Sequence, residues 1–127
     1  MKNSILGLFI LLFFGCEAAT SPDSGEELVI EYGQTIVDRN ISIKFRGVGE
    51  DSRCPTGVEC VWEGNAEIIL QIASSDSTTI YSLNTTLEPK VITHSDYQVE
   101  LVQVSPYPVE EETITLEDYE IRVALIK

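Results

Sequence analysis

Three cysteines are the residues whose positions most narrow the chemistry that this chain can perform. Cys16 follows an apolar run near the start, whereas Cys54 and Cys60 lie close together in the middle of the chain. A thiol can be acylated, can bind a metal or can pair as a disulfide, and an odd number of cysteines in an exported chain leaves one to be explained. If the chain is exported, the three positions predict one modified cysteine and one pair.

His94 is the only histidine and therefore the obvious candidate for proton transfer. Ser95 and Asp96 follow it directly, but adjacent residues in a turn rarely face one another, and a catalytic triad is recognised by geometry among separated elements. No Gly-x-Ser-x-Gly motif is present in the sequence. We interpret His94 as a solvated loop residue and expect no catalytic residues in this chain.

Metal-ligating patterns are weak. Zinc needs several Cys or His ligands at suitable spacing, and the two unmodified cysteines are better used as a disulfide. Oxygens for Ca²⁺ could come from the carboxylates near the cysteines, although their spacing matches no EF-hand loop. These carboxylates are Glu50, Asp51, Glu59 and Glu63. We expect no metal and no cofactor, with a weak calcium site left as an open alternative.

The first fifteen residues have the features of an export signal. Lys2 supplies a positive charge, and residues 5–15 are apolar but too few for an ordinary spanning helix of about 20 residues. Leu12-Phe13-Phe14-Gly15-Cys16 resembles the lipobox of bacterial lipoproteins, with Phe14 larger than the usual residue at its position. The resemblance implies removal of residues 1–15 and acylation of Cys16.

The alternative is an ordinary secreted protein that is cleaved slightly downstream, after Ala18 or Ala19. Acylation of Cys16 would explain the odd cysteine count and would hold the chain on a membrane, since two or more acyl chains give stable anchoring. Residues 16–27 are polar and acidic, which is typical of a flexible tether rather than of a packed segment. Glu17 supplies no familiar inner-membrane retention signal, so we expect an outer-membrane location, facing either the periplasm or the medium.

The remaining residues, 28–127, suffice for one domain. The chain carries eight Lys and Arg against 21 Asp and Glu, a formal net charge of −13, and the loss of Lys2 makes the mature chain one unit more negative. Nucleic acid is an improbable partner because phosphate binding relies on clustered cations, and here the cations are scattered. Another envelope protein or a cationic ligand fits this charge better.

The domain is predicted to be all-β. Apolar and polar residues alternate with period two in one segment after another, with turn residues between the segments. Predicted strands lie near residues 28–37, with a break at Gly33, and near residues 41–46, 62–72, 78–83, 91–93, 97–104 and 119–126. About seven short antiparallel strands suggest a β-sandwich of immunoglobulin-like architecture or a small barrel. In the longest segment, Trp62 is separated from Ala66, Ile68 and Leu70 by even numbers of residues. In a continuous strand these side chains would share one face, so we expect the Trp62 side chain in the core.

The loop around the paired cysteines is the most distinctive local sequence. Asp51-Ser52-Arg53-Cys54-Pro55, followed by Gly57-Val58, Cys60-Val61-Trp62 and Gly64-Asn65-Ala66, resembles a motif of small exported bacterial proteins, many of them lipoproteins without an assigned activity. The resemblance covers residues 51–66 and carries over no catalytic role. A loop with these residues is typical of a segment whose role is structural.

Each residue type in this loop has a physical interpretation. In an oxidising compartment Cys54 and Cys60 are expected to form a disulfide. Arg53 can pair with a carboxylate or donate to carbonyl oxygens across the loop, and Asp51 can accept hydrogen bonds from backbone N–H groups. Pro55 and Gly57 set a turn. We therefore expect a non-enzymatic binding or structural module anchored in the bacterial envelope, the alternative being an envelope hydrolase or accessory subunit that uses Asp or Glu.

Overall fold

The computed structural model describes residues 25–127 and confirms an all-β domain with antiparallel strands. Eight strands are present, against about seven predicted. In chain order they are β1 (Glu26–Glu31), β2 (Thr35–Asp38), β3 (Ile41–Asp51), β4 (Ala66–Ala73), β5 (Thr78–Asn84), β6 (Val91–His94), β7 (Tyr97–Ser105) and β8 (Glu120–Ile126). A single 3₁₀ turn, η1 (Leu116–Asp118), precedes β8. Within the described residues, no helix is long and apolar enough to cross a membrane.

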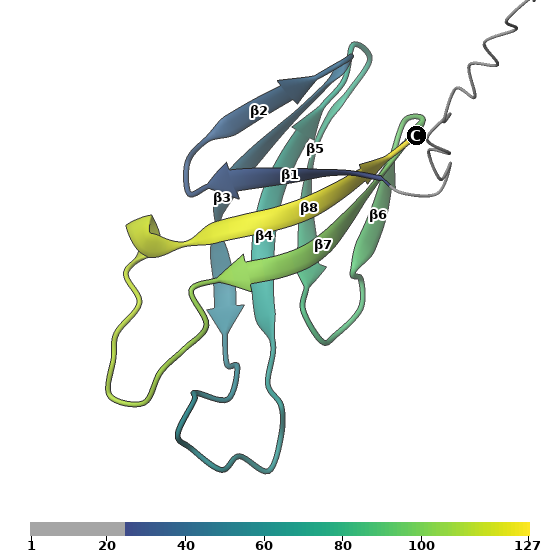
Figure 1. The fold of residues 1–127 in the computed structure, drawn as a ribbon. Coiled ribbons are helices and arrows are strands. Elements are labelled where there is room, and N and C mark those ends of the chain that lie inside the picture. The colour runs from purple at the N-terminus through teal and green to yellow at the C-terminus, as the bar shows by residue number, and fades with distance from the viewer. Residues whose placement is uncertain (1–24) are drawn as a thin grey trace, which may run out of the picture.

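The strands form two four-stranded antiparallel sheets that pack as a sandwich rather than close into a barrel (Figure 1). One sheet has the order β1-β8-β7-β6 and the other β2-β3-β4-β5. Strand β1 begins at Glu26 and pairs with β8 from Glu26 opposite Leu125 onward. Two residues predicted to lie in the tether, Glu26 and Glu27, therefore belong to the domain. The predicted signal peptide, residues 1–15, and residues 16–24 of the predicted tether lie outside the described residues.

The core follows from the alternation of the strands. Ile41, Ile43 and Phe45 of β3 are buried, as their shared parity predicts, and the β4 residues of even number are buried one after another from Ala66 to Ile72. The opposite sheet contributes inward residues of β7 and β8 such as Val99, Ile121 and Val123. Burial of each such aliphatic side chain contributes about 1.5–3 kcal/mol, which is why period two fixes the register.

The sandwich has two ends with different content (Figure 1). At one end residue 25 enters the domain, and the β2–β3, β4–β5 and β6–β7 turns gather near Lys127. We call this the tether end. At the other end lie the connections between β3 and β4, which contains the disulfide, and between β7 and β8. We call this the cysteine-loop end.

Candidate functional site

The connection between β3 and β4 is held closed by covalent and backbone links. Cys54 and Cys60 form the expected disulfide, with Cα atoms 5.9 Å apart. Below the ring, the N–H of Ser52 donates to the Asn65 carbonyl at 2.8 Å and the N–H of Cys54 donates to the Glu63 carbonyl at 3.1 Å. Pro55 and Gly57 form the predicted turn, since the Val58 N–H donates to the Pro55 carbonyl and Gly57 has a φ of 94°.

Arg53 is buried beneath this ring and makes both kinds of contact that the sequence predicts. Its Nε and Nη2 atoms donate to the two carboxylate oxygens of Asp51, each at 2.8 Å. Nη1 donates to the Val104 carbonyl at 2.7 Å, and Nη2 also donates to the Pro106 carbonyl at 2.9 Å. Because the fork of the guanidinium satisfies four acceptors on two loops, Arg53 joins the cysteine loop to the end of β7.

Two tyrosines complete this junction. The Tyr119 hydroxyl donates to Asp51 Oδ2 at 2.7 Å, and the Tyr107 hydroxyl donates to the Cys54 carbonyl at 2.7 Å. The Arg53 guanidinium carbon lies 5.2 Å from the centroid of the Tyr107 ring, a cation–π distance. A parallel bridge between Thr56 and Val109 adds a backbone link. The disulfide ring is thus tied at several points to the β7–β8 connection, and we call residues 54–62 the platform.

The contacts within this cluster shift the pKa values of Asp51 and Tyr119. Burial opposes ionisation of Asp51, but the hydrogen bonds from Arg53 and Tyr119 outweigh it and lower the Asp51 pKa below 3.8. Burial, together with the hydrogen bond to Asp51, raises the Tyr119 pKa to about 12. At neutral pH the cluster therefore holds one carboxylate, one guanidinium and one neutral phenol.

These shifts predict loss of stability at both extremes of pH. The folded Asp51 has a lowered pKa, so its contribution to the free energy of unfolding is complete above its unfolded pKa and falls as pH drops through the folded value. Tyr119 has a raised pKa, so its contribution is complete below pH 10.0 and disappears as pH rises towards 12. Urea denaturation between pH 2 and 12 checks both predictions. Asp51→Asn should remove the acid dependence of this cluster and Tyr119→Phe the alkaline one; unchanged profiles would contradict the assignment.

Trp62 does not lie in the core, which corrects the prediction from strand parity. Its side chain is 81% exposed, and that of the preceding Val61 is 89% exposed. Strand β4 begins only at Ala66, and Gly64 has a left-handed φ of 74°, which breaks the alternation before it reaches Trp62. Consequently the tryptophan stands on the surface of the platform instead of beneath it.

A cavity of about 370 Å³ lies beside Trp62. Leu87, 58% exposed, lines it from the β5–β6 connection, and Glu50 and Glu63 contribute carboxylates. Its floor is fixed by Asn65, which is buried and bonded through its side-chain amide to Asn84 and to the N–H groups of Thr86 and Leu87. A large exposed indole next to a formed hollow is typical of a recognition surface.

Two of the four carboxylates considered for Ca²⁺, Asp51 and Glu63, have other contacts. Asp51 is bound by Arg53 and Tyr119, and Glu63 Oε1 accepts a hydrogen bond from the Thr86 hydroxyl at 3.1 Å. No cluster of three or more His, Cys, Asp or Glu side chains within residues 25–127 is arranged to hold a metal ion. Asp51 is therefore removed from that hypothetical ligand set.

His94 is buried, so its interpretation as a solvated loop residue was wrong. It ends β6, and its Nδ1 atom lies 2.8 Å from the Tyr81 hydroxyl while its Nε2 atom lies 3.0 Å from Ser74 Oγ. Ser95 and Asp96 make no hydrogen bond with the imidazole among the described residues, in agreement with the expectation that these neighbours do not face it. The partners of His94 come from the β4–β5 hairpin, which sequence adjacency does not reveal.

The disulfide gives a stability prediction of its own. Because the ring is short, its removal in a Cys54→Ser/Cys60→Ser variant should lower the free energy of unfolding by about 2–3 kcal/mol at most. Urea denaturation of this variant, and of the wild type after reduction, should give the same loss. A loss above about 4 kcal/mol would contradict a mainly entropic role for the ring.

Sequence reasoning missed Val61, Tyr107 and Tyr119 as parts of this site. Val61 could have been found, since Val61-Trp62 is an apolar pair flanked by Glu59, Cys60 and Glu63. The two tyrosines are 53 and 68 residues from their acceptors, and no local pattern signals such contacts.

Comparison of the chain with protein-family models, with curated proteins and with solved structures found no match.

Proposed function

We propose that this protein is a bacterial envelope lipoprotein, anchored through acylated Cys16, whose domain is a non-enzymatic binding module. The observation that carries the proposal is the exposure of Val61 and Trp62 on a platform fixed by the disulfide and by Arg53. Ordering of a loop before binding lowers the entropic cost of association, and tryptophans on ordered loops are frequent hot spots. The platform lies at the opposite end of the sandwich from residue 25 (Figure 1), so a membrane tether would present it outward.

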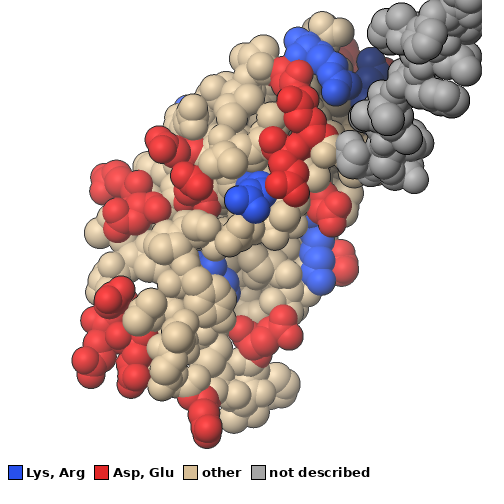
Figure 2. Space-filling view, viewed as in Figure 1, with Lys and Arg blue, Asp and Glu red and all other residues tan. Residues whose placement is uncertain are grey.

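The charge around the platform indicates the kind of partner. Glu59 and Glu63 flank Val61-Trp62 in the sequence, and Glu50 lines the cavity beside Trp62. In Figure 2 the cysteine-loop end shows an uncharged surface with acidic side chains at its margins. The partner that fits is an envelope protein with an apolar recess for Trp62 and a basic rim. Such pairing should weaken as ionic strength rises, because exposed charges are screened within about 10 Å at 0.1 M salt.

Site-specific crosslinking in the native host tests this module. A photoreactive residue at position 61 in the full-length protein should give one defined adduct, and Trp62→Ala in the same background should remove it, since loss of a hot-spot indole costs about 2 kcal/mol or more. The matched control carries the photoreactive residue at Val37, which is 72% exposed on the β2 edge strand. Equal adducts from both positions, or adducts that survive Trp62→Ala, would refute the platform as the binding surface.

The anchor has a separate test in the mass of the protein purified from its native membrane. We expect the mass of residues 16–127 plus acyl chains, with a gain of two hydrogen atoms when the disulfide is reduced. Cys16→Ser should release the protein from the membrane fraction without changing its folded domain. An unacylated mass would instead identify a secreted factor and leave the platform proposal intact.

A second candidate is an envelope hydrolase that uses two carboxylates, favoured by the placement of Glu50 and Glu63 around one cavity beside Trp62. Incubation with purified peptidoglycan, scored by new reducing ends, separates the two functions. Turnover that is lost in Glu50→Gln or Glu63→Gln would establish the hydrolase. The leading proposal expects no turnover from the wild type.

A further inference from the structure

Strand β5 is an edge strand that lacks the features by which proteins usually protect an edge. The edge strands of the two sheets are β1, β2, β5 and β6. Charged side chains, proline, β-bulges or a short length commonly block such edges. β1 contains three glutamates, and β2 and β6 have only four residues each. β5 has seven residues, none of them charged or proline, and pairs with β4 without a register shift. It is therefore the edge best suited to pair with a further strand.

The hydrogen bonds at the end of β5 show which of its backbone groups face away from β4. The Thr85 N–H donates to the Ala66 carbonyl at 3.1 Å, towards β4, whereas the Asn84 N–H donates to the Pro89 carbonyl at 3.0 Å. Because the direction of the backbone groups alternates along an antiparallel strand, the odd-numbered residues of β5 bond to β4. The even-numbered residues direct their N–H and carbonyl groups to the open edge. Within residues 25–127, no backbone hydrogen bond outside the sheet occupies these groups of Thr78, Ile80 and Ser82.

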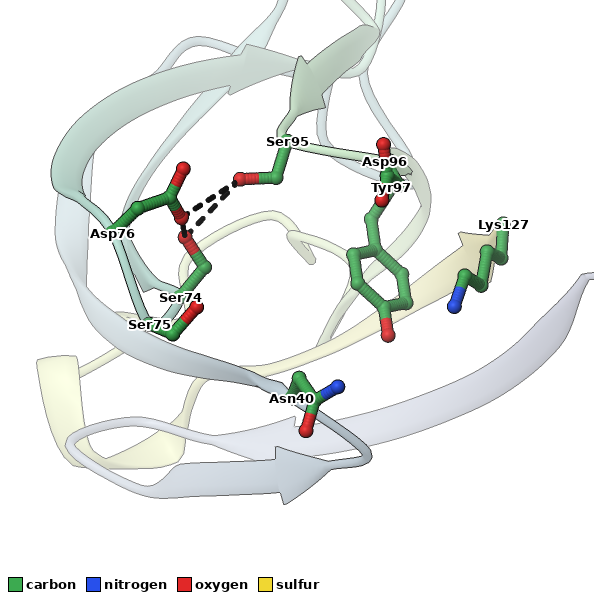
Figure 3. Close-up of a pocket in the computed structure, with 8 residues that line it drawn as sticks. All are labelled: Asn40, Ser74, Ser75, Asp76, Ser95, Asp96, Tyr97 and Lys127. Carbon is green, nitrogen blue, oxygen red and sulfur yellow. Dashed lines mark hydrogen bonds between the residues drawn. The ribbon is translucent and has the colours of Figure 1, made fainter.

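Contacts at the start and in the middle of β5 hold this edge in place. In the turn before β5, Asp76 Oδ1 accepts from Ser74 Oγ at 2.7 Å and from Ser95 Oγ at 3.3 Å, as Figure 3 shows. Ser95 lies between β6 and β7, so these bonds link the two sheets. Further along, the Tyr81 hydroxyl lies 2.8 Å from His94 Nδ1. A strand that is ordered in advance loses less conformational entropy when it pairs.

The side chains of β5 are arranged almost symmetrically about Ile80. Ile80 is 56% exposed, and a hydroxyl side chain stands two residues away on each side, from Thr78 and from Ser82. If a second copy of β5 pairs antiparallel about a two-fold axis at Ile80, each isoleucine lies opposite the other and each Thr78 lies opposite a Ser82. On the other face Thr79 lies opposite Tyr81, an aromatic and β-branched pair. Cross-strand pairs of these kinds stabilise a sheet. The strand is therefore complementary to itself, as a two-fold interface requires.

Charge also favours this edge for contact between two copies of the chain. With a net charge of −13, two copies repel one another wherever their acidic side chains meet. Residues 78–82 carry no charge, and neither do the β4 residues beside them on the outer face, which are Ile69, Gln71 and Ala73. Two copies can therefore pair along β5 without opposing carboxylates within the paired residues. A strand of another protein could use the same backbone groups, but the symmetry about Ile80 is matched by a second copy.

We propose that this protein forms a two-fold dimer in which β5 pairs antiparallel with β5 of a second copy, with Ile80 on the axis. The pairing joins the β2-β3-β4-β5 sheets of the two copies into one continuous sheet. It uses the backbone groups of Thr78, Ile80 and Ser82 that face the open edge. The dimer is closed, because each copy has used its only β5 edge. The inference goes beyond the binding module proposed above and requires neither the anchor nor Trp62.

The direction of pairing has a consequence for anchored copies. Antiparallel strands place the tether ends of the two copies at opposite ends of the dimer. Residues 16–24 can reach at most about 30 Å when extended, so both copies could be anchored in one membrane if the joined sheet lies along it. A monomer would present its platform away from the membrane, and the dimer would turn both platforms to lie along the membrane.

Cysteine crosslinking of the full-length protein in its native membrane tests the register. Directly opposite residues of a hydrogen-bonded antiparallel pair have Cα atoms about 5.5 Å apart, within the range that a disulfide spans. Ile80→Cys should therefore give a covalent dimer on mild oxidation. Thr78→Cys is the matched control on the same edge, because its two thiols would lie about 14 Å apart along the strands. Val37→Cys on the β2 edge controls for random collision. No dimer from Ile80→Cys, or equal yields from all three variants, would overturn the proposal.

Sedimentation equilibrium of the mature chain carrying Cys16→Ser, which cannot be acylated, measures the association directly. We expect a monomer–dimer equilibrium that Ile80→Lys weakens by about tenfold or more, since two ammonium groups would face each other across the axis. Val37→Lys, at another exposed edge position, should leave the association unchanged. An unchanged urea midpoint would show that Ile80→Lys still folds, as the exposure of Ile80 leads us to expect.

Three results would overturn the dimer. The first is a protein that stays monomeric up to about 1 mM, the effective concentration typical of tethered pairs. The second is unchanged association of Ile80→Lys, and the third is an adduct of Ile80→Cys with a different protein, which would assign the edge to a foreign strand. Trp62→Ala should leave the dimer intact, and Ile80→Lys should leave the adduct from position 61 intact. Failure of the dimer is therefore distinguishable from failure of the platform proposal.

Discussion

Replacement of Arg53 by methionine is expected to lower the free energy of unfolding by about 3–5 kcal/mol, the largest effect of any single substitution considered. The side chains of Arg53 and Asp51 are only 6% and 11% exposed, so methionine would leave a buried carboxylate without its cation. The carbonyls of Val104 and Pro106 would lose their donors in the same step. Urea denaturation at pH 7 measures the loss.

Three comparisons separate the buried pair from arginine removal in general. Arg46→Met on the exposed face of β3 removes one hydrogen bond to Gln71 and should cost about 1 kcal/mol or less. Arg53→Lys keeps the charge but not the fork, and we expect an intermediate loss. Adding Asp51→Asn to Arg53→Met should recover part of the loss, because the unpaired charge disappears. A cost for Arg53→Met equal to that for Arg46→Met would refute the role of the pair.

The consequence for function follows from where Arg53 lies. It joins the cysteine loop to the β7–β8 connection, so its loss should increase the motion of the platform before it unfolds the sandwich. In Arg53→Met, the yield of the crosslinked adduct from position 61 should therefore fall by more than the loss in the free energy of unfolding alone would predict. Under the proposed function, the buried pair would link a stable β domain to an ordered binding surface.

The parts of the fold that could be predicted are those set by local alternation. Ile41, Ile43 and Phe45 share one face in the sequence and in the structure, and Pro106 ends β7 where the missing N–H forbids continuation. Cys54 and Cys60 could be paired because they are close in the chain and the chain has the features of an exported protein. In each case the physical cause acts over a few residues.

The parts that could not be predicted depend on distant contacts or on one backbone angle. His94 is buried because Ser74 and Tyr81 of another hairpin satisfy both ring nitrogens, 20 and 13 residues away. Asp51 meets Tyr119 across 68 residues. If the alternation of β4 continued towards the N-terminus, Trp62 would lie in the core. The alternation ends at Gly64, whose backbone has a left-handed φ angle.

Gly64 is therefore predicted to be the residue that keeps Trp62 on the surface, and Gly64→Ala should cost about 2–4 kcal/mol of stability. Left-handed backbone costs an L-residue about 1–2 kcal/mol, and at this position a Cβ would collide with the carbonyl group of Ser52, which is backbone and cannot swing aside. Relief of the clash must separate Ser52 from Asn65 and so open the base of the loop.

Two other glycines turn this prediction into a controlled series. Gly33 has a φ of 79° but open space where a methyl group would lie, so Gly33→Ala should show the cost of the left-handed angle alone, about 1–2 kcal/mol. Gly47 has neither constraint, and Gly47→Ala within β3 should be close to neutral.

The fluorescence emission of Trp62, the single tryptophan of the chain, reports whether the indole changes its surroundings in each variant. If Gly64→Ala shifts Trp62 emission and abolishes crosslinking at position 61 while Gly33→Ala does neither, the close approach at Gly64 is what presents the indole. Equal losses for Gly64→Ala and Gly33→Ala would instead show that the backbone angle alone sets the loop.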